Sequence, residues 1–310
     1  MGLALDRAFG EPPVPTRWHP VALFGSAVAG FESRLYRDRV LPGAVLAATA
    51  TGLAAAAGTA IRSTTAAAYL SIAGRSLHAA ALDVAAALDR GDLDAARSLL
   101  PSLVGRDPSS LDHEGIARAA VESVAENTTD AVVAPALWAA AAGPVGAFVH
   151  RAADTLDSMV GYPNARYRRF GMAAARLDDV LAWVPARATV ALVALVRPAA
   201  AAAVVRTVRR DAPAHPSPNA GAAEAAFAGA LGLRLGGETR YGDRVEHRPV
   251  LGTGRPPRSG DVRLAVALSR DVTWALAGLL ACLAAAAGRA HLAPAGGAAR
   301  RPRSGRRTGR

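Results

Sequence analysis

The sequence predicts an all-α, polytopic integral membrane protein with about four to five membrane segments and polar juxtamembrane helices and loops. Mean hydropathy is +0.18, and 51% of the 310 residues are hydrophobic. Long runs of alanine, leucine and valine carry this apolar content, which is typical of helical membrane proteins. No stretch alternates with period two for long enough to predict a sheet.

Four apolar stretches approach the roughly 20 residues that a helix needs to cross a bilayer. The second contains Pro135 and a Gly143-Pro144 pair, which can break a helix. The third carries Arg187 and Arg197, and the fourth is short but uncharged. In chain order they are residues 40–61, 131–149, 180–205 and 272–287.

The segments between these stretches are more polar. Residues 66–88 begin apolar and then gain charges at helical spacing, so they either return across the membrane or lie along it. Residues 89–130 predict two helices separated by a turn, with Ser110 or Asp112 capping the second. Residues 211–271 are rich in proline and glycine and predict loops with short helices.

Arginine placement predicts the topology in part. Arg34, Arg37 and Arg39 precede the first apolar stretch, and an arginine-rich segment follows the last, so both are expected in the cytoplasm. If residues 131–149 crossed fully, the polar groups on either side would face opposite compartments. A broken or re-entrant segment that lines a cavity would return them to one face.

The formal net charge is +11, and all 36 basic residues are arginine. We expect residues 1–292 to form one membrane domain and residues 293–310, with six arginines and no acid, to be a disordered cytoplasmic tail. Anionic lipid is the alternative partner of this tail. Nucleic acid is not expected, because no aromatic residues alternate with the arginines.

Three further features limit the possible chemistry and processing of the chain. The single cysteine, Cys282, excludes an intrachain disulfide and is expected to be buried and inert. Charges at Asp6, Arg7 and Glu11 argue against a signal peptide. The Walker A pattern needs a lysine that the chain lacks, and no zincin or nucleophile-elbow pattern occurs.

Polar side chains recur every four residues before the second apolar stretch. On a helix they form one stripe, in which Arg118 can pair with Glu122 while the other acids repel one another. Mg²⁺ would offset that repulsion and leave room for phosphate oxygens. The alternative is a solvated helix face paired with loop arginines. The stripe consists of Glu114, Arg118, Glu122, Glu126 and Asp130, with Asn127 beside it.

Residues 154–179 form a second polar cluster, in which acids and arginines border apolar runs. Charged groups near membrane depth indicate a functional site, and arginine forks fit phosphate. A juxtamembrane charge belt is the alternative. The candidates are Asp154, Asp157, Arg166, Arg168 and Arg176. A weaker signal comes from His215 and Asn219 in a proline-rich loop and from His19, since lone loop histidines are more often structural.

In order along the chain, these motifs resemble the CobD/CbiB family of adenosylcobinamide-phosphate synthases. The matching text includes LDRAFGEPP, LVGRDPSSLD, ESVAENTTD, DTLDSMVGYPNARYRRFG, HPSPNAG and RPVLGTGRPP. Two departures stand out: Ala222 and Ala223 replace a tryptophan-proline pair usual in the family, and GGETRYGDRV differs from the usual glycine-rich turn.

The resemblance implies a multi-pass cell-membrane enzyme of cobalamin biosynthesis, a C–N bond-forming ligase. It would join the propionate of adenosylcobyric acid to (R)-1-aminopropan-2-ol phosphate, or to aminopropanol, with ATP as cosubstrate and Mg²⁺ as cofactor. Lipid is an expected partner, and other cobalamin-assembly enzymes are possible ones. The preferred amine and the oligomeric state stay open.

The resemblance also suggests roles for the candidates. Glu126, Asp130, Asp154 and Asp157 would hold Mg²⁺ or act as base, together with Glu122. Phosphates would bind Arg166, Arg168 and Arg176, while Asn127 and Asn219 orient polar groups. His215 or His19 would shuttle a proton. The rival functions are a small membrane transporter, which predicts acids deep inside spans, and a non-catalytic scaffold for corrinoid assembly.

Overall fold

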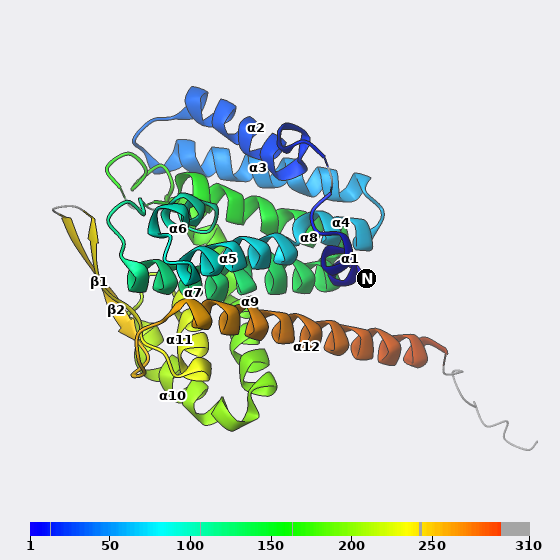
Figure 1. Cartoon of the computed structure of the whole chain (residues 1–310). Helices are drawn as coiled ribbons and strands as arrows, with labels where there is room; N and C mark the ends of the chain where they lie inside the picture. The colour runs from blue at the N-terminus through cyan, green and yellow to red at the C-terminus, as the bar shows by residue number, and fades with distance from the viewer. Residues whose placement is uncertain (13, 106, 163, 242–243, 293–310) are drawn as a thin grey trace, which may run out of the picture.

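The computed structural model describes residues 1–292 except Pro13, Arg106, Pro163, Gly242 and Asp243 (Figure 1). The described part is a helical bundle with one β-hairpin at one end. Its main elements are α1 (Gly2–Phe9), α2 (Pro20–Leu35), α3 (Val40–Ala60), α4 (Thr64–Ser71), α5 (Gly74–Asp89), α6 (Leu93–Leu99), α7 (His113–Thr128), α8 (Ala134–Val160), α9 (Met172–Val196), α10 (Ala201–Asp211), α11 (Ala220–Leu231), β1 (Leu235–Tyr241), β2 (Arg244–Leu251) and α12 (Ser259–Leu292).

Four helical stretches of the described chain are long and apolar enough to cross a membrane. Only 28–44% of each apolar window is buried inside the protein. The outward faces carry large apolar side chains such as Leu53 on α3, Val180 on α9 and Leu283 on α12. Lipid is the solvent that such faces require. The prediction of an all-α polytopic membrane fold is confirmed; the stretches are Val40–Ala60, His113–Val160, Met172–Val196 and Ser259–Ala287.

The stretch His113–Val160 is a helical hairpin, not one straight rod. The helical backbone breaks at Ala142 and Gly143, where Gly143 has φ 61° and ψ −149°, values that only glycine adopts readily. A Cβ atom at Gly146 would collide with the Trp138 carbonyl oxygen, so the two limbs fold back on each other. The polar residues before and after residues 131–149 therefore return to one neighbourhood, as a re-entrant segment predicts.

The limbs pack differently on their neighbours. Near the turn, Gly58 of α3 meets the backbone of Val145, while Gly43 at the other end of α3 meets Phe170. On the first limb, Thr128 donates a hydrogen bond to Ser269 of α12 at 2.8 Å. Helices α3 and α12 begin at the same end of the molecule, and Figure 1 shows this parallel arrangement.

This direction bears on the predicted topology. If α3 and α12 both cross the membrane, the arginines before α3 and the end of α12 lie on opposite sides. The reversal at Gly143 adds a crossing that an arginine count cannot detect, and the expectation that both arginine-rich segments are cytoplasmic stays a prediction. Residues 293–310, for which we expected a disordered tail, lie outside the described residues.

Strands β1 and β2 pair in antiparallel orientation, whereas the sequence predicted loops with short helices in this region. Gly232 ends α11 in the left-handed conformation, and the strands then pair from Leu235 with Leu251 to Tyr241 with Arg244. A register irregularity between Leu235 and Gly237 interrupts the alternation that identifies a strand in sequence.

Three smaller expectations have mixed outcomes. Residues 66–88 form two helices, α4 and α5, whose inner faces are fully buried at positions such as Ala67 and Val84. Asp112 caps α7, accepting a hydrogen bond from the Gly115 N–H at 2.8 Å. Cys282 is exposed, so the prediction of a buried thiol is wrong; α12 presents that face outward.

Candidate active site

The hairpin brings acidic side chains from three helices together. Asp130 interacts electrostatically with Glu126, Asp154 and Asp178. In a straight helix Asp130 and Asp154 would be about 36 Å apart at 1.5 Å per residue, so the cluster exists because the chain reverses at Gly143. Asp157 and Asp179 extend it, since both interact with Asp178. These acids lie within the helical stretches His113–Val160 and Met172–Val196, whereas the sequence placed them at the borders of shorter apolar spans.

The helix is irregular where it supplies Asp130. Residues Thr129–Val133 form a π-helical turn between α7 and α8. A π turn adds a residue to the helical repeat and turns the following side chains relative to the preceding ones. Asp130 lies within this turn, and π turns are frequent at functional sites.

Arg151 is one cation of this cluster. It lies one turn before Asp154 on the second limb of α8, and its Nη1 is 2.9 Å from Asp154 Oδ2. Both side chains are less than a quarter exposed. Arg176 interacts with Asp179 at the edge of the cluster, so these two guanidinium groups offset only part of the negative charge of the six acids.

Arg151 also lines three cavities. One, of about 280 Å³, lies between α5 and α7 and includes Asn127, Ser123 and Ser76. A second, also about 280 Å³, is formed with Glu11 and His19. Glu11 and Arg151 belong to both, so these two cavities are parts of one cleft. The third, about 150 Å³, is apolar and lies among α2, α3 and α8.

The acidic cluster fits Mg²⁺ binding by one or two carboxylates, but not by a complete protein cage. Among the described residues, no three His, Cys, Asp or Glu side chains are arranged to hold a metal ion together. The predicted set of Glu126, Asp130, Asp154 and Asp157 is therefore not a preformed cage. Mg²⁺ is usually held by one or two carboxylates, with water and substrate phosphates completing its shell, and the cluster offers carboxylates for that.

Arg176 lines a neighbouring pocket on α9, and Asn219 directly follows Pro218 of its lining. Arg176, Asp179 and Trp183 line a cavity of about 460 Å³. Asn219 donates to the Asp179 carbonyl oxygen at 2.9 Å and accepts from Arg187 at 2.6 Å. The Arg187 guanidinium lies 4.7 Å from the Trp183 ring centre. Asn219 thus holds α11 against α9 and positions Arg187.

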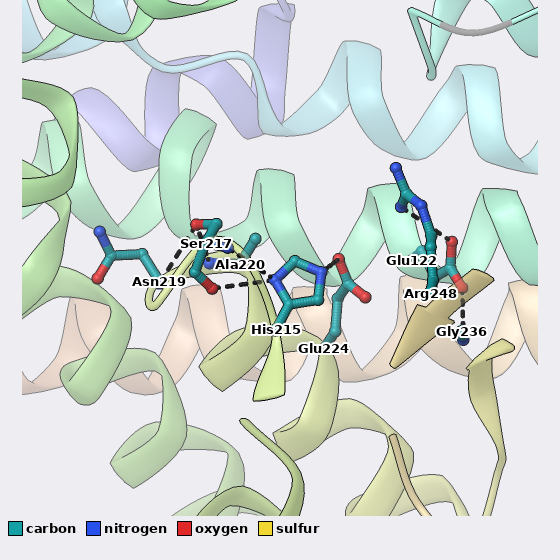
Figure 2. Close-up of polar contacts among 8 residues, drawn as sticks. All are labelled: Glu122, His215, Ser217, Asn219, Ala220, Glu224, Gly236 and Arg248. Carbon is teal, nitrogen blue, oxygen red and sulfur yellow. Dashed lines mark hydrogen bonds and ion pairs between the residues drawn. The ribbon is translucent and has the colours of Figure 1, made fainter. Parts of the chain in front are cut away.

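Glu122 and His215 lie in a separate buried network (Figure 2). Glu122 accepts a hydrogen bond from the Gly236 N–H at 2.8 Å, and Arg248 Nη1 lies 3.9 Å away. His215 Nε2 is 3.9 Å from buried Glu224, and burial lowers the His215 pKa. The network joins the β-hairpin and α11 to α7. The predicted acidic stripe therefore splits, with Glu122 here and Glu126 in the acidic cluster.

Arg166 and Arg168 lie in the turn after α8. Arg166 Nη2 is 2.9 Å from Glu32 Oε1, and Arg166 Cζ is 4.5 Å from the centre of the Tyr36 ring. These contacts fasten this turn to α2. The Glu32 hydrogen bond raises the Arg166 pKa. Arg168 is exposed. The structure does not place either arginine beside the acidic cluster.

Several residues of the site were missed. Arg151 lies two residues beyond the apolar stretch 131–149 and is not in the predicted set, although its place one turn before Asp154 is a signal for a salt bridge. Asp178 and Glu11 are not in the predicted set because only the fold brings them near the other groups. The sequence did identify Asn127 and His19, and both line the Arg151 cleft.

Taken together, the spans, the re-entrant hairpin and the polar cluster define a polytopic membrane protein with a charged site between its helices. A family model described as CobD/Cbib protein matches residues 1–269, and the chain belongs to that family.

Relatives extend this match over most of the chain. A protein named "Cobalamin biosynthesis protein CobD" from Mycobacterium tuberculosis (strain H37Rv) is 49% identical over 285 residues, covering 88% of this chain and 90% of its own. Proteins of the same name from Chromobacterium violaceum and Rhodobacter capsulatus are 41% and 40% identical, covering 94% and 87% of this chain and 97% and 91% of their own. No solved structure matches.

Proposed function

We propose that this protein is a cell-membrane enzyme of cobalamin biosynthesis, an adenosylcobinamide-phosphate synthase. It forms the amide bond between the propionate of adenosylcobyric acid and aminopropanol phosphate or aminopropanol. Family membership and the names of the relatives support the pathway. The convergence of acids and Arg151 from α7, α8 and α9 next to open cavities supports catalysis by this chain.

The chemistry requires activation before amide formation. A propionate oxygen attacks the γ-phosphorus of ATP, which gives an acyl phosphate and releases ADP. The amine nitrogen then attacks the acyl carbon, the bond from that carbon to the phosphate oxygen breaks, and inorganic phosphate leaves. The proton lost by the amine goes to a base. Stabilisation of phosphoryl charge is the main task of the protein in such transfers.

The described groups divide these tasks. Arg151 and Arg176 line cavities on either side of the acids and are placed to bind phosphoryl oxygens. A carboxylate among Glu126, Asp154 and Asp157 takes the amine proton. Mg²⁺, when bound to one or two of these carboxylates, would neutralise phosphate charge. His19 in the cleft remains a candidate for proton transfer.

Purified full-length protein in lipid nanodiscs tests the proposal. Given ATP, Mg²⁺, adenosylcobyric acid and aminopropanol phosphate, it should form the amide, detected by mass spectrometry. Glu126→Gln and Asp157→Asn should each lower the rate about 10²-fold or more, the contribution of a positioned acid or base. Asp94→Asn is the control, since the Asp94 side chain is 94% exposed on α6.

The scaffold alternative makes the opposite prediction. If folded protein forms no amide, or if both variants keep the full rate, the chemistry does not reside in this chain. The acids line the sides of spans near the hairpin, which also leaves an ion relay as a second candidate. The same purified protein can be reconstituted in liposomes for a flux assay. Proton or cation flux in the absence of ATP and corrinoid would favour a transporter.

A further inference from the structure

The cleft shared by Glu11 and Arg151 holds opposite charges in one small space. Its two parts are each about 280 Å³, and Glu11 and Arg151 line both. No ion pair joins these two side chains within the part of the chain that the structure describes. Arg151 is paired instead with Asp154, which lies outside the lining of both parts.

Neutral hydrogen-bonding groups share the rest of the cleft wall with apolar side chains such as Leu77 and Val21. Ser76, Ser102, Ser123 and Asn127 line one part. His19 lines the other, and its Nε2 atom is buried with no hydrogen-bond partner among the described residues. The Nε atom of Arg151 is likewise buried and without a partner there. Buried polar atoms without partners are rare, and a bound ligand is one way to satisfy them.

We infer that this cleft binds a small molecule carrying both an ammonium group and a phosphate group. Glu11 binds the ammonium, while Arg151, His19 and the Ser76 hydroxyl bind the phosphate. The hydroxyls of Ser102 and Ser123 already donate hydrogen bonds to backbone carbonyl oxygens. A guanidinium binds phosphate through paired, charge-assisted hydrogen bonds, which a free hydroxyl group on the ligand could not replace. The inference rests on the proposed function and assigns its amine substrate to this cleft.

The Arg151–Asp154 pair gives the cleft a further property. A phosphate that binds Arg151 shares the guanidinium with the Asp154 carboxylate, which contacts Nη1 and leaves Nε without a partner among the described residues. Binding of the phosphate therefore weakens the attraction between Arg151 and Asp154 and makes this carboxylate more available to the acidic cluster, where a base is needed once the amine is present. Arg151 is in this sense a positioning residue for Asp154 as well as a ligand-binding one.

Binding measurements on the full chain test this without ATP or corrinoid. Isothermal titration in nanodiscs would use aminopropanol phosphate, aminopropanol and inorganic phosphate as separate probes. Wild-type protein should bind aminopropanol phosphate at least about tenfold more tightly than aminopropanol, a difference of 1.4 kcal/mol. Arg151→Gln should abolish that preference, and Arg151→Lys should keep part of it. Glu11→Gln should weaken the binding of both amines and leave the affinity for inorganic phosphate unchanged.

The sharpest arm is Asp154→Asn. Removal of the Asp154 carboxylate should tighten the binding of aminopropanol phosphate about threefold to tenfold. A purely structural role of Asp154 predicts unchanged or weaker binding. Asp94→Asn is a matched control, because Asp94 pairs with Arg97 at the same i,i+3 spacing, with 3.0 Å between Asp94 Oδ1 and Arg97 Nη1. It should change nothing.

The outcomes separate the two proposals. If Arg176→Gln, not Arg151→Gln, removes the phosphate preference, the phosphate binds in the α9 cavity and the inference is wrong. If folded Arg151→Gln and Arg151→Lys both bind like wild type, the inference is also wrong, but amide synthesis can still stand. If wild-type protein makes the amide yet shows no preference for the phosphorylated amine, only the subsite assignment is lost. If it neither binds amines nor makes amide, both proposals fall.

Discussion

Two polar regions of this molecule use the same residue types in opposite ways. In the Glu122–His215 network, buried acids meet backbone N–H, histidine and arginine groups, and both Glu122 and Glu224 are only 3% exposed. In the acidic cluster, carboxylates face one another, with Arg151 as a nearby cation. Buried polar groups that are paired stabilise a fold. Carboxylates that repel one another beside a cavity instead favour the binding of a ligand or cation that offsets their charge.

The comparison also separates neighbours on one helix. Glu122 and Glu126 are one turn apart on α7 and share a stripe in the sequence, yet they belong to different regions. The difference comes from what packs on each turn, the β-hairpin at Glu122 and the second limb of α8 at Glu126. Spacing along a helix predicts which side chains share a face, but not which partners cover it.

The largest effect on stability is expected in the Glu122–His215 network. Glu122→Ala removes the acceptor of the Gly236 N–H and leaves Arg248 without this carboxylate. Breaking one partner of a buried pair costs about 3–5 kcal/mol, so little folded protein should be recovered from membranes. Glu114→Ala, on the same stripe but 47% exposed, should fold normally. Equal yields of the two variants by fluorescence size-exclusion chromatography would contradict a structural role for Glu122.

The next largest effect on stability is expected at Gly143, where the chain reversal brings the acidic cluster together. Gly143→Ala places a side chain at φ 61° and ψ −149°, which costs about 1–3 kcal/mol and should open the hairpin turn. The melting temperature should drop, and amide synthesis should fall with it. Gly278→Ala on α12 is the control, because a Cβ there meets nothing within 4 Å. A wild-type melting curve for Gly143→Ala would show that the reversal does not depend on this glycine.

Much of this fold follows from local sequence, and the site much less so. The helix caps, the apolar spans and α7 depend on residues close together in the sequence. Hydropathy and the capping residue Asp112 are therefore enough to predict them. The β-hairpin was missed because its strands are irregular and depend on α7 through Glu122. Arg151 and Asp178 were missed because their importance arises from a chain reversal, and a Gly-Pro pair in an apolar run indicates a break but not its angle.

A smaller effect is expected on the pH dependence of stability, through His215 in the Glu122–His215 network. Burial lowers the His215 pKa from 6.5, so the unfolded chain binds a proton that the folded chain resists. The stability held at neutral pH should therefore be lost progressively below about pH 6.5. His215→Gln should show a weaker loss between pH 7 and pH 5, measured as the change in melting temperature. A steeper loss in this variant would mean that protonated His215 is stabilised by Glu224 instead.

The smallest effect should have the opposite sign. Asp178 interacts with Glu126, Asp154, Asp157 and Asp179, all of its own charge. Asp178→Asn keeps the shape and removes repulsion, so stability should rise by about 0.5 kcal/mol or stay level, as for relief of a like-charge contact. Amide synthesis should fall at the same time if this carboxylate serves the site. A variant that loses stability would place Asp178 among the paired groups, and one that keeps full activity would limit the working carboxylates to α7 and α8.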